Sequence, residues 1–598
     1  MIPSGCISNA FLKTAKRLLC LFIIVTGERI GLTRRRIRYD WLFGIVLATL
    51  MFLILFWFGN FRYENSDDML MVKPFMGFEG GTPANFTLYT HTLLAWLLYG
   101  VSLAVPGVAW FSVYQMGLLY FSAVVLGKNM AQLAQARRRP WLASGLGTLI
   151  LLSVFAAFAC CRVSYTSTAG LAGAAAVAQQ LTAGQSEYTT RQRLRAYGLS
   201  LFLLVCAYCL RAVSVLPALA FSALVFLWQW RSRREQPARY FRPLLIALAL
   251  YVGVFGALAG IRQAEISLRG LQPDIDWQNA RIALMDYTDF QTDPAPALAA
   301  NSGLSASETE LVRQWYFLSS DIDTTALRKM AAAYPPLSAE GAPGRLIAFF
   351  SQNPRYAAMA VLLTLLTALC WLGDRKNAPL TAAAATLAWL GAILLLLYLG
   401  LRGRMIGRGV DTVLMPCAAA LFGFLMLQKP PAGRGRRAAL LVMICLSLVV
   451  SGYALRITAH AVTRPQDTVS QQREAELETY ALQNPNLLVV RDTALLRDTR
   501  LFPSVSAGLP INITLWGDWG CRTPSWNRQL ALYGLDADHF TASDWVSDRI
   551  VFAVADPSGT ANLLAYLTDA LGSPVEAVPC GESGALRFYR FQLAQTGA

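Results

Sequence analysis

WLFGIVLATLMFLILFWFG (residues 41–59) is an unbroken apolar run near the start of the chain. It has no charged side chain and approaches the roughly 20 residues that an α-helix needs to cross the hydrocarbon core of a bilayer. Similar runs recur as far as Tyr453. Of the 598 residues, 55% are hydrophobic and 15% charged, whereas soluble domains carry roughly 25% charged residues. The sequence therefore predicts an integral membrane protein.

The apolar runs alternate with short basic loops. Lys and Arg gather in every second loop, so the positive-inside rule assigns those loops to the cytoplasm. One further run, 90–105, would reverse this pattern if it crossed, and we expect it to lie as a helix on the outer membrane surface. The remaining runs predict about eleven transmembrane helices: 41–59, 108–126, 142–160, 168–181, 198–210, 215–230, 243–261, 356–372, 380–401, 413–427 and 438–455.

This topology divides the chain into three parts. Residues 1–40 form a cytoplasmic basic segment, and residues 41–456 form the transmembrane core. The core carries two outer loops, 60–106 and 262–354, and the second should contain helices of its own. Residues 457–598 form an extracytoplasmic domain, because the last crossing runs outward.

The C-terminal part alternates helix-like and strand-like segments, which is typical of a small α/β domain. The expected helices are 471–483 and 560–571, and the expected strands are 487–490, 550–554 and 586–591. Cys521 and Cys580 are the only cysteines of this part. They are candidates for a disulfide if the domain lies outside the cell.

The net charge of +16 has a topological explanation. In a soluble protein it would suggest a nucleic-acid partner, but here the basic residues lie between apolar runs. We therefore expect no nucleic-acid partner. The sequence has no Walker A loop and no serine-hydrolase or zinc-protease signature, so ATP-driven transport is not expected.

Asp67 and Asp68 follow the first apolar run in the first outer loop. Adjacent carboxylates at a membrane surface are costly to bury unless a cation accompanies them. They could form a solvated acidic loop. Alternatively one of them acts as a general base, and the pair could hold a divalent metal such as Mg or Mn. Glu79 and His91 follow and are candidates for positioning a substrate, although a lone histidine is more often a structural residue.

Four arginines lie where the charge rule does not predict them. Arg402, Arg404 and Arg408 lie between two apolar runs on the expected outer side, and Arg211 lies at an outer helix end. Arginine matches the geometry of a phosphate and stays charged, which indicates a phosphate or pyrophosphate site. A wrong topology for this stretch, or contacts with lipid headgroups, would explain the arginines equally well.

The second outer loop combines aromatic and charged residues near Trp277. Arg281 and Asp286 are its candidates for positioning a donor or an acceptor. Aromatic rings beside carboxylates are common where sugars bind, and they are equally common as anchors at the membrane interface.

The order of these features resembles a known family. The first span is followed by a loop with an acidic pair (65–70), by a surface helix with a histidine (90–100) and by a second span. This order is similar to that of the GT-C superfamily of membrane glycosyltransferases, which includes oligosaccharyltransferases, protein mannosyltransferases and aminoarabinose transferases. The expected fold is therefore a GT-C-like polytopic α-helical membrane protein with a small extracytoplasmic α/β domain at its C-terminus.

The resemblance also implies a function. Such enzymes take a sugar from a polyprenyl-phosphate carrier at the outer face of the membrane. For this chain the resemblance implies transfer to a cell-surface glycan or glycolipid acceptor, in a bacterial-type cytoplasmic membrane. Carried onto this chain, Asp67 or Asp68 would activate the acceptor hydroxyl. The residues that would hold the donor phosphate are Arg404, Arg408, Arg211 and Arg402.

Two other function classes remain open from the sequence. One is a transporter or flippase of a lipid-linked saccharide, and the other is a non-catalytic assembly protein of the membrane. Transporters often carry inverted repeats and helices broken at mid-membrane. The sequence has no evident repeat and its polar candidates gather at one face, which favours the enzyme.

Overall fold

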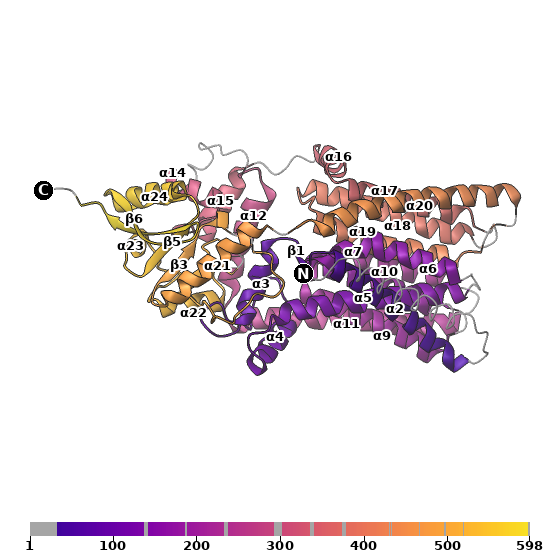
Figure 1. Ribbon diagram of the computed structural model, residues 1–598. Coiled ribbons are helices and arrows are strands. Elements are labelled where there is room, and N and C mark those ends of the chain that lie inside the picture. The colour runs from indigo at the N-terminus through magenta and orange to yellow at the C-terminus, as the bar shows by residue number, and fades with distance from the viewer. Residues whose placement is uncertain are drawn as a thin grey trace, which may run out of the picture.

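The computed structural model describes residues 33–595, except 137–140, 186–187, 233–236, 292–301, 318, 335–339, 374–377, 430, 432, 466, 496–497 and 518–519. The predicted basic segment 1–40 therefore lies mostly outside the described residues. Figure 1 shows an elongated molecule, with a bundle of long helices on one side and a domain containing a β-sheet on the other. We call the end of the bundle that meets this domain the domain end, and the opposite end the far end.

Long apolar helices make up the bundle. Within the described ranges, 10 helices are long and apolar enough to cross a membrane. They are α2 (Thr33–Phe58), α5 (Trp110–Ala136), the continuous run of α6 (Trp141–Ile150), π-helix η1 (Leu151–Ala156) and α7 (Ala157–Cys161), α9 (Thr190–Leu210), α10 (Ala212–Ser232), α11 (Pro237–Leu268), α17 (Pro354–Trp371), α18 (Ala378–Leu401), α19 (Gly407–Leu427) and α20 (Arg434–Thr463). The prediction of a polytopic helical membrane protein is confirmed.

The weakest predicted span, 168–181, forms helix α8 (Tyr165–Ala183) at the centre of the bundle. Every residue of α8 is buried, and the helix packs against α5, α9, α10 and α19. Because protein surrounds it, α8 needs no lipid-facing apolar surface, and its Ala, Gly, Thr and Gln residues leave it less apolar than the other spans. With α8 included, the bundle agrees with the prediction of about eleven crossings.

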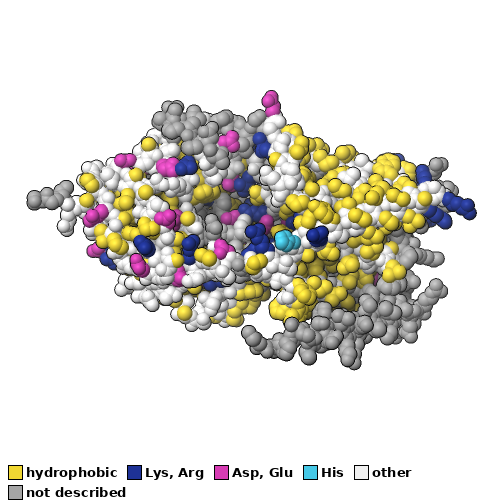
Figure 2. Space-filling model, turned by 45° about the horizontal axis from the view of Figure 1, so that its top comes forward, with side chains coloured by type: hydrophobic (Ala, Val, Ile, Leu, Met, Phe, Trp, Pro, Cys, Tyr) yellow, Lys and Arg dark blue, Asp and Glu magenta, His cyan; other side chains and the backbone are white. Residues whose placement is uncertain are grey.

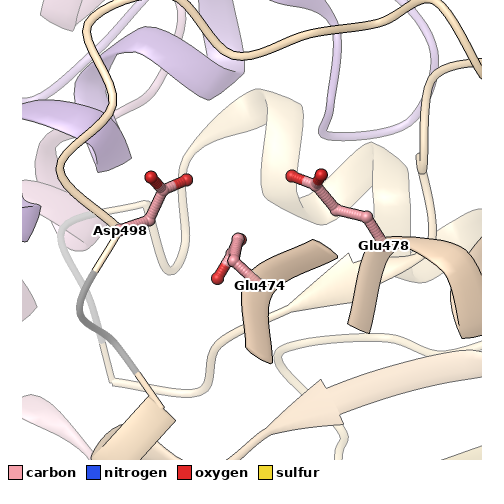
Figure 3. A group of neighbouring side chains, drawn as sticks. All are labelled: Glu474, Glu478 and Asp498. Atoms are coloured by element: carbon pink, nitrogen blue, oxygen red, sulfur yellow. The ribbon is translucent and has the colours of Figure 1, made fainter. Parts of the chain in front are cut away.

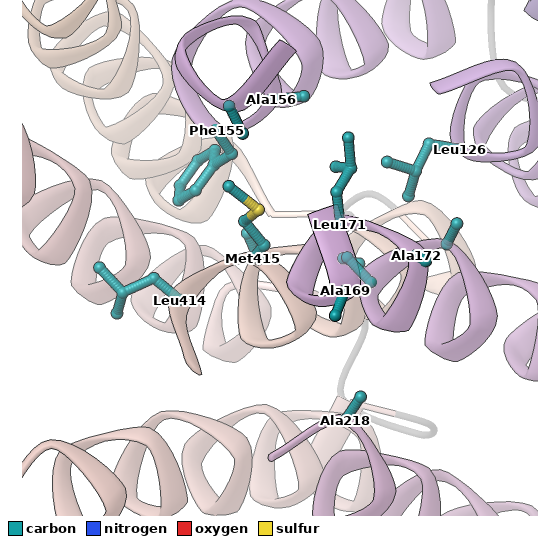
Figure 4. Packing of buried hydrophobic residues seen from close by; sticks show 14 of the residues in the cluster. Leu126, Phe155, Ala156, Ala169, Leu171, Ala172, Ala218, Leu414 and Met415 are labelled. Atoms are coloured by element: carbon teal, nitrogen blue, oxygen red, sulfur yellow. The ribbon is translucent and has the colours of Figure 1, made fainter. Parts of the chain in front are cut away.

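Small residues let the neighbouring helices approach α8 closely. A Cβ atom added to Gly173 would lie 2.6 Å from Cβ of Ala218 on α10, and one added to Gly170 would lie 3.0 Å from Cα of Thr412 on α19. A larger residue at Gly173 would therefore push α10 away. Figure 4 shows the same packing at Ala169, Leu171 and Ala172 of α8, which lie among Leu126, Phe155, Ala156, Ala218, Leu414 and Met415.

Two short helices and a small sheet lie at the domain end. Strand β1 (Arg62–Tyr63) pairs in parallel with β2 (Arg162–Val163), and α3 (Ser66–Met76) follows β1. Helix α4 (Thr92–Ala104) is apolar, but its 13 residues span only about 20 Å. That length is too short to cross a bilayer, and its exposed side chains include Trp96 and Leu97. These features fit the surface helix expected at 90–105.

The C-terminal domain contains a five-stranded sheet in the order β4-β3-β5-β7-β6. The strands are β4 (Ile513–Thr514), β3 (Leu488–Arg491), β5 (Ile550–Val554), β7 (Leu586–Leu593) and β6 (Val575–Ser583). The first three are parallel, and β7 and β6 are antiparallel additions. The helices and 3-10 turns are α21 (Thr468–Gln483), η3 (Thr493–Leu495), α22 (Pro524–Leu532), α23 (Ala542–Trp545), η4 (Pro557–Thr560) and α24 (Ala561–Leu571). The α/β prediction is confirmed.

Part of the outer segment 262–354 is built into this domain. Its helices are α12 (Gln272–Tyr287), α14 (Ala306–Arg313), α15 (Thr324–Ala333) and α16 (Ala342–Gln352). Trp277 of α12 shares an apolar core with Trp516 and Trp545, and the backbone N–H of Phe317 donates to the carbonyl of Trp516 at 3.0 Å. Two stretches far apart in sequence therefore form one folded unit at the domain end of the bundle.

The predicted disulfide is wrong, because no bond joins Cys521 to Cys580 in the described domain. Cys521 is buried, and its sulfur accepts a hydrogen bond from the backbone N–H of Gly517 at 3.1 Å. Cys580 is exposed on edge strand β6. The two thiols therefore lie in different surroundings, and counting cysteines could not reveal this.

Candidate site at the junction of bundle and domain

The surface is hollowed where the helix bundle meets the sheet domain (Figure 2). Lys, Arg, Asp and Glu side chains gather in and around this hollow, whereas the bundle beside it is mostly hydrophobic. Most of the sequence candidates lie at the ends of elements that meet at this junction: α3, α9, α12, α19 and the turn between α18 and α19.

Asp67 and Asp68 lie in the first turn of α3. The pairing of β1 with β2 brings the end of α2 beside the start of α8, and α3 begins at Ser66, shortly after β1. A helix N-terminus favours negative charge, so two adjacent carboxylates are well placed there. The two side chains nevertheless have different surroundings.

Asp68 is fully buried between α3 and α8. Its Oδ1 accepts a hydrogen bond from the backbone N–H of Tyr165, the first residue of α8, at 2.6 Å. Burial raises the pKa of Asp68 well above its ordinary value, although the N–H of Tyr165 acts in the opposite direction. Asp68 therefore holds α3 against α8.

Asp67 is the accessible member of the pair, with 24% of its side chain exposed. Its Oδ2 accepts a hydrogen bond from Nη2 of Arg408 at 2.7 Å. The second terminal nitrogen of Arg408, Nη1, is buried and has no hydrogen-bond partner among the described residues. Arg408 therefore holds Asp67 with one nitrogen and keeps a second donor for another acceptor.

The turn between α18 and α19 brings two more arginines to the junction. Gly403 has a φ of 66°, a left-handed conformation that glycine adopts readily and that reverses the chain here. Nη1 of Arg404 lies 2.9 Å from Oδ1 of Asp286, and the guanidinium of Arg402 lies 4.5 Å from the ring centroid of Tyr287. These contacts join the bundle to the end of α12.

Arg211 approaches the same place from the end of α9. Its Nη1 donates to the hydroxyl of Thr166 at 2.9 Å, and its guanidinium lies 4.6 Å from the ring centroid of Tyr165 and 5.1 Å from that of Tyr89. Tyr165 also donates its N–H to Asp68, so Tyr165 links Arg211 to the acidic pair.

A buried ion pair lies next to Arg408. Nη2 of Arg355 on α17 lies 3.4 Å from Oδ1 of Asp411 on α19, and the hydroxyl of Ser167 donates to the other carboxylate oxygen at 3.2 Å. Asp411 follows Arg408 by three residues and lies on the same face of α19. The pair therefore fixes the start of α19, from which Arg408 reaches Asp67.

Three residues of the junction did not stand out in the sequence: Glu64, Arg355 and Asp411. Burial raises the pKa of Glu64 to about 7, the charge of Asp411 adds to this, and Arg408 and Arg355 oppose it. A signal was present for two of the three residues. Asp411 is an acidic residue at the edge of an apolar run, and Arg355 is a further basic residue on the expected outer side.

Three candidates from the sequence have structural contacts elsewhere. Nδ1 of His91 accepts from the N–H of Leu93 at 3.2 Å, and its Nε2 lies 2.8 Å from the carbonyl of Leu258, so His91 fixes α4 on α11. Arg281 is buried and donates to the carbonyl of Gly517 at 2.9 Å. Glu79 accepts from the hydroxyl of Ser525. They hold the outer segments in place.

The junction favours binding of an anion. Its arginines are Arg211, Arg355, Arg402, Arg404 and Arg408, and its carboxyl groups are Glu64, Asp67, Asp68, Asp286 and Asp411. The pKa values of Glu64 and Asp68 are both raised. A raised pKa favours the neutral acid, so these two groups carry less negative charge than ordinary carboxylates, which suits a phosphate among the five arginines.

The acidic pair does not fit a divalent cation. A cation at Asp67 would lie against the guanidinium of Arg408, 2.7 Å from Oδ2. Asp68 is fully buried, and its Oδ1 already accepts a hydrogen bond from the N–H of Tyr165. Repulsion from Arg408 would weaken binding of Mg or Mn by these two residues.

A second acidic group lies under the domain, where Glu474, Glu478 and Asp498 approach one another (Figure 3). It belongs to an ion-pair network whose members are Lys73–Glu474, Lys73–Asp498, Arg491–Glu474, Arg500–Glu478 and Arg500–Asp498. Burial alone would raise the pKa of Glu474, but the charges of Arg491 and Lys73 lower it to about 2. Three cations balance three carboxylates, so this group ties α3 to the domain and leaves no negative charge for a metal.

Comparisons with known proteins give weak matches. No protein-family model matches the chain, and no curated protein matches it. Two crystal structures of ArnT from Cupriavidus metallidurans align over 92% of this chain. The apo structure is 13% identical, with 97% of its chain covered and a TM-score of 0.38. The structure bound to undecaprenyl phosphate is 11% identical, with 98% covered and a TM-score of 0.35.

With TM-scores under 0.5, these alignments support no residue assignment.

Proposed function

We propose that the chain is a membrane glycosyltransferase that moves a sugar from a polyprenyl-phosphate carrier to a cell-surface glycan or glycolipid acceptor. One observation carries the proposal. Arg408 holds the accessible carboxylate of Asp67 through Nη2, while its buried Nη1 has no partner in the described chain. A single guanidinium can therefore contact both a base and a phosphate.

The proposed step is a displacement at the anomeric carbon of the sugar. The acceptor hydroxyl forms a new bond to this carbon and gives its proton to Asp67, while the bond from the carbon to the phosphate oxygen breaks. The electron pair leaves with the polyprenyl phosphate. Arg408, together with Arg404 and Arg211 of the same junction, stabilises the negative charge that develops on this leaving group.

The orientation follows from the charges at the far end. Arg191 and Arg195 at the start of α9, Arg231 at the end of α10, and Arg434 and Arg437 at the start of α20 all belong to that end. The positive-inside rule assigns the far end to the cytoplasm. The junction and the sheet domain would then face outward, where a lipid-linked sugar and a surface acceptor can meet.

The centre of the bundle argues against the transporter or flippase. Helix α8 is buried along its whole length and packs tightly against four neighbours. A pathway for a saccharide through the bundle would have to displace this helix. The polar groups of the junction instead lie at one end of the spans, as a transferase that meets its lipid donor at the surface requires.

The test uses a strain that lacks the gene, complemented with the wild type, Asp67→Asn or Asp569→Asn at matched levels. Asp569 is an exposed residue of α24 and serves as the control. We expect Asp67→Asn to lose one sugar from the surface polymer, measured by mass spectrometry, while Asp569→Asn restores it. A polymer of normal composition with Asp67→Asn, together with its loss in the deletion strain, would refute the transferase.

A further inference from the structure

A groove runs along the side of the bundle between α2 and α20. Its volume is about 290 Å³. Its lining is almost entirely apolar and includes Leu50 and Ile54 of α2, Leu149 of α6, and Leu455 and Ala459 of α20. Leu50, Ile54, Leu149 and Leu455 are all exposed. The groove is therefore open to the hydrocarbon core of the membrane.

The length of the groove matches one leaflet. On α2 its lining extends from Leu47 to Phe58, which corresponds to about 18 Å of helix. Half of a hydrocarbon core is about 15 Å thick. One acyl chain of the leaflet on the domain side fits this length, whereas a polyprenyl chain is far longer.

Basic side chains border the groove at its domain end. Arg456 and His460 of α20 and Arg464, the residue that caps its end, follow one another at intervals of four residues, so they lie on one side of this helix end. All three are exposed, and each comes directly after a residue that lines the groove. Figure 2 shows basic side chains and a histidine at the border between the apolar bundle and the rest of the surface.

A further basic residue, Arg62 of β1, lies beside this stripe. Burial lowers the pKa of Arg62, and the positive charge of Arg464 lowers it further. The nearby Asp467 acts in the opposite direction, but its carboxylate already accepts from the hydroxyl of Ser470 at 2.6 Å. Among the described residues, no carboxylate lies within 4.0 Å of a basic nitrogen of Arg62, Arg456, His460 or Arg464.

One polar atom inside the groove also lacks a partner. Thr458 lines the groove and is 1% exposed, and its hydroxyl has no hydrogen-bond partner in the described chain. A buried hydroxyl without a partner is costly. An ester or hydroxyl oxygen near the top of a bound lipid would satisfy it.

We infer that this groove binds an anionic phospholipid of the membrane. Its acyl chain lies between α2 and α20, and its phosphate lies among Arg62, Arg464 and the adjoining stripe. Each arginine near a membrane surface strengthens anionic-lipid binding about fivefold. The lipid links the ends of α2 and α20 just below β1, the strand that leads to α3. This inference does not depend on the proposed function.

The test is native mass spectrometry of the purified full chain with phosphatidylglycerol or phosphatidylcholine of the same acyl chains. We expect the wild type to retain phosphatidylglycerol at least about tenfold more strongly, since several cations face the headgroup. The triple variant Arg456→Gln/His460→Gln/Arg464→Gln should lose this preference. The matched control, Arg434→Gln/Arg436→Gln/Arg437→Gln, changes three cations at the other end of α20 and should keep it.

A second variant tests the groove with all four basic side chains intact. Ala459→Trp should fill the groove and release the phospholipid without affecting the stripe. Equal retention of both lipids by the wild type would overturn the inference, and so would unchanged retention by Ala459→Trp. Displacement of the bound phospholipid by equimolar undecaprenyl phosphate would also overturn it, because the groove would then be a carrier site. None of these readouts requires glycosyl transfer.

Discussion

Arg408 lies 341 positions after Asp67 in the sequence, and its Nη2 donates to Oδ2 of Asp67 at 2.7 Å. The contact joins the first turn of α3 to the first turn of α19. Asp67 is partly exposed, whereas Asp68 is buried and bound to the N–H of Tyr165. The sequence left open which of the two would be the base, and these contacts favour Asp67.

Asp68 should matter for stability more than for turnover. In Asp68→Asn the amide oxygen can still accept from the N–H of Tyr165, so we expect activity within a few fold of the wild type. In Asp68→Ala that N–H loses its partner, at a cost of about 1–3 kcal/mol. Thermal unfolding in detergent would measure this loss. Abolished turnover in a stably folded Asp68→Asn would instead make Asp68 the base.

Arg408→Lys should lower kcat/KM for the lipid-linked donor about 100-fold. Lysine keeps the charge but cannot direct two nitrogens of one planar group at Asp67 and a phosphate. Turnover measured over a range of donor concentrations gives the effect. Arg328→Lys, on the exposed face of α15, should be silent. Equal activity of Arg408→Lys and the wild type would contradict a two-sided role for the guanidinium.

The pKa of Glu64 predicts a pH-dependent cost. A carboxyl group whose pKa is raised from 4.5 to about 7 by burial stabilises the fold below pH 4.5 and loses that contribution as the pH rises through 7. At pH 8 the free energy of unfolding is therefore about 3 kcal/mol lower than it would be with Glu64 protonated. We expect Glu64→Gln to match the wild type in thermal stability near pH 4.5 and to exceed it at pH 8. The same difference at both pH values would argue against a buried Glu64.

Much of the fold could be predicted from the sequence, because hydrophobic runs and loop charges are local signals. The spans, the short apolar helix within 90–105 and three strands of the sheet were found in this way. Strand β6 was missed, because Pro579 and Gly581 make it look like a turn. An edge strand with a bulge tolerates both residues, and β6 has that position and that irregularity.

The site could be predicted only in part. The arginines before and at the start of α19 stood out because they break the charge rule, and Asp67 stood out because it is acidic beside a span. Their pairing depends on tertiary contacts between distant segments, which no local pattern contains. The packing of α12 into the sheet domain likewise depends on contacts between distant segments. The structural roles of His91 and Arg281 became visible only through their hydrogen bonds.

Lys73→Met should loosen α3. Lys73 joins this helix to Glu474 and Asp498 of the domain, so its loss should speed hydrogen exchange over residues 66–76 and reduce turnover severalfold. Lys329→Met, an exposed lysine of α15, is the matched control. The pKa of Glu474 is lowered to about 2. Its contribution to the stability of the fold is therefore complete above pH 4.5 and is lost as the pH falls toward 2. Unchanged exchange would show that Lys73 does not hold α3.

Chelation tests whether a divalent cation takes part. Because Arg408 occupies the carboxylate of Asp67, we expect turnover by the purified protein to survive EDTA with less than a twofold change. Mg and Mn added back should have no effect. A loss of activity that either ion restores would show that a metal binds at the junction despite the guanidinium.

The most direct measurement follows release of free polyprenyl phosphate by the purified protein in liposomes. The donor is the lipid-linked sugar fraction from the deletion strain, and the acceptor is the surface glycolipid fraction of the same strain. We expect the wild type and Asp569→Asn to release polyprenyl phosphate as the acceptor gains one sugar, and Asp67→Asn to be slower by a factor of about 100 or more. Equal release by Asp67→Asn and the wild type would contradict the account, because the carboxylate held by Arg408 would then have no part in the reaction.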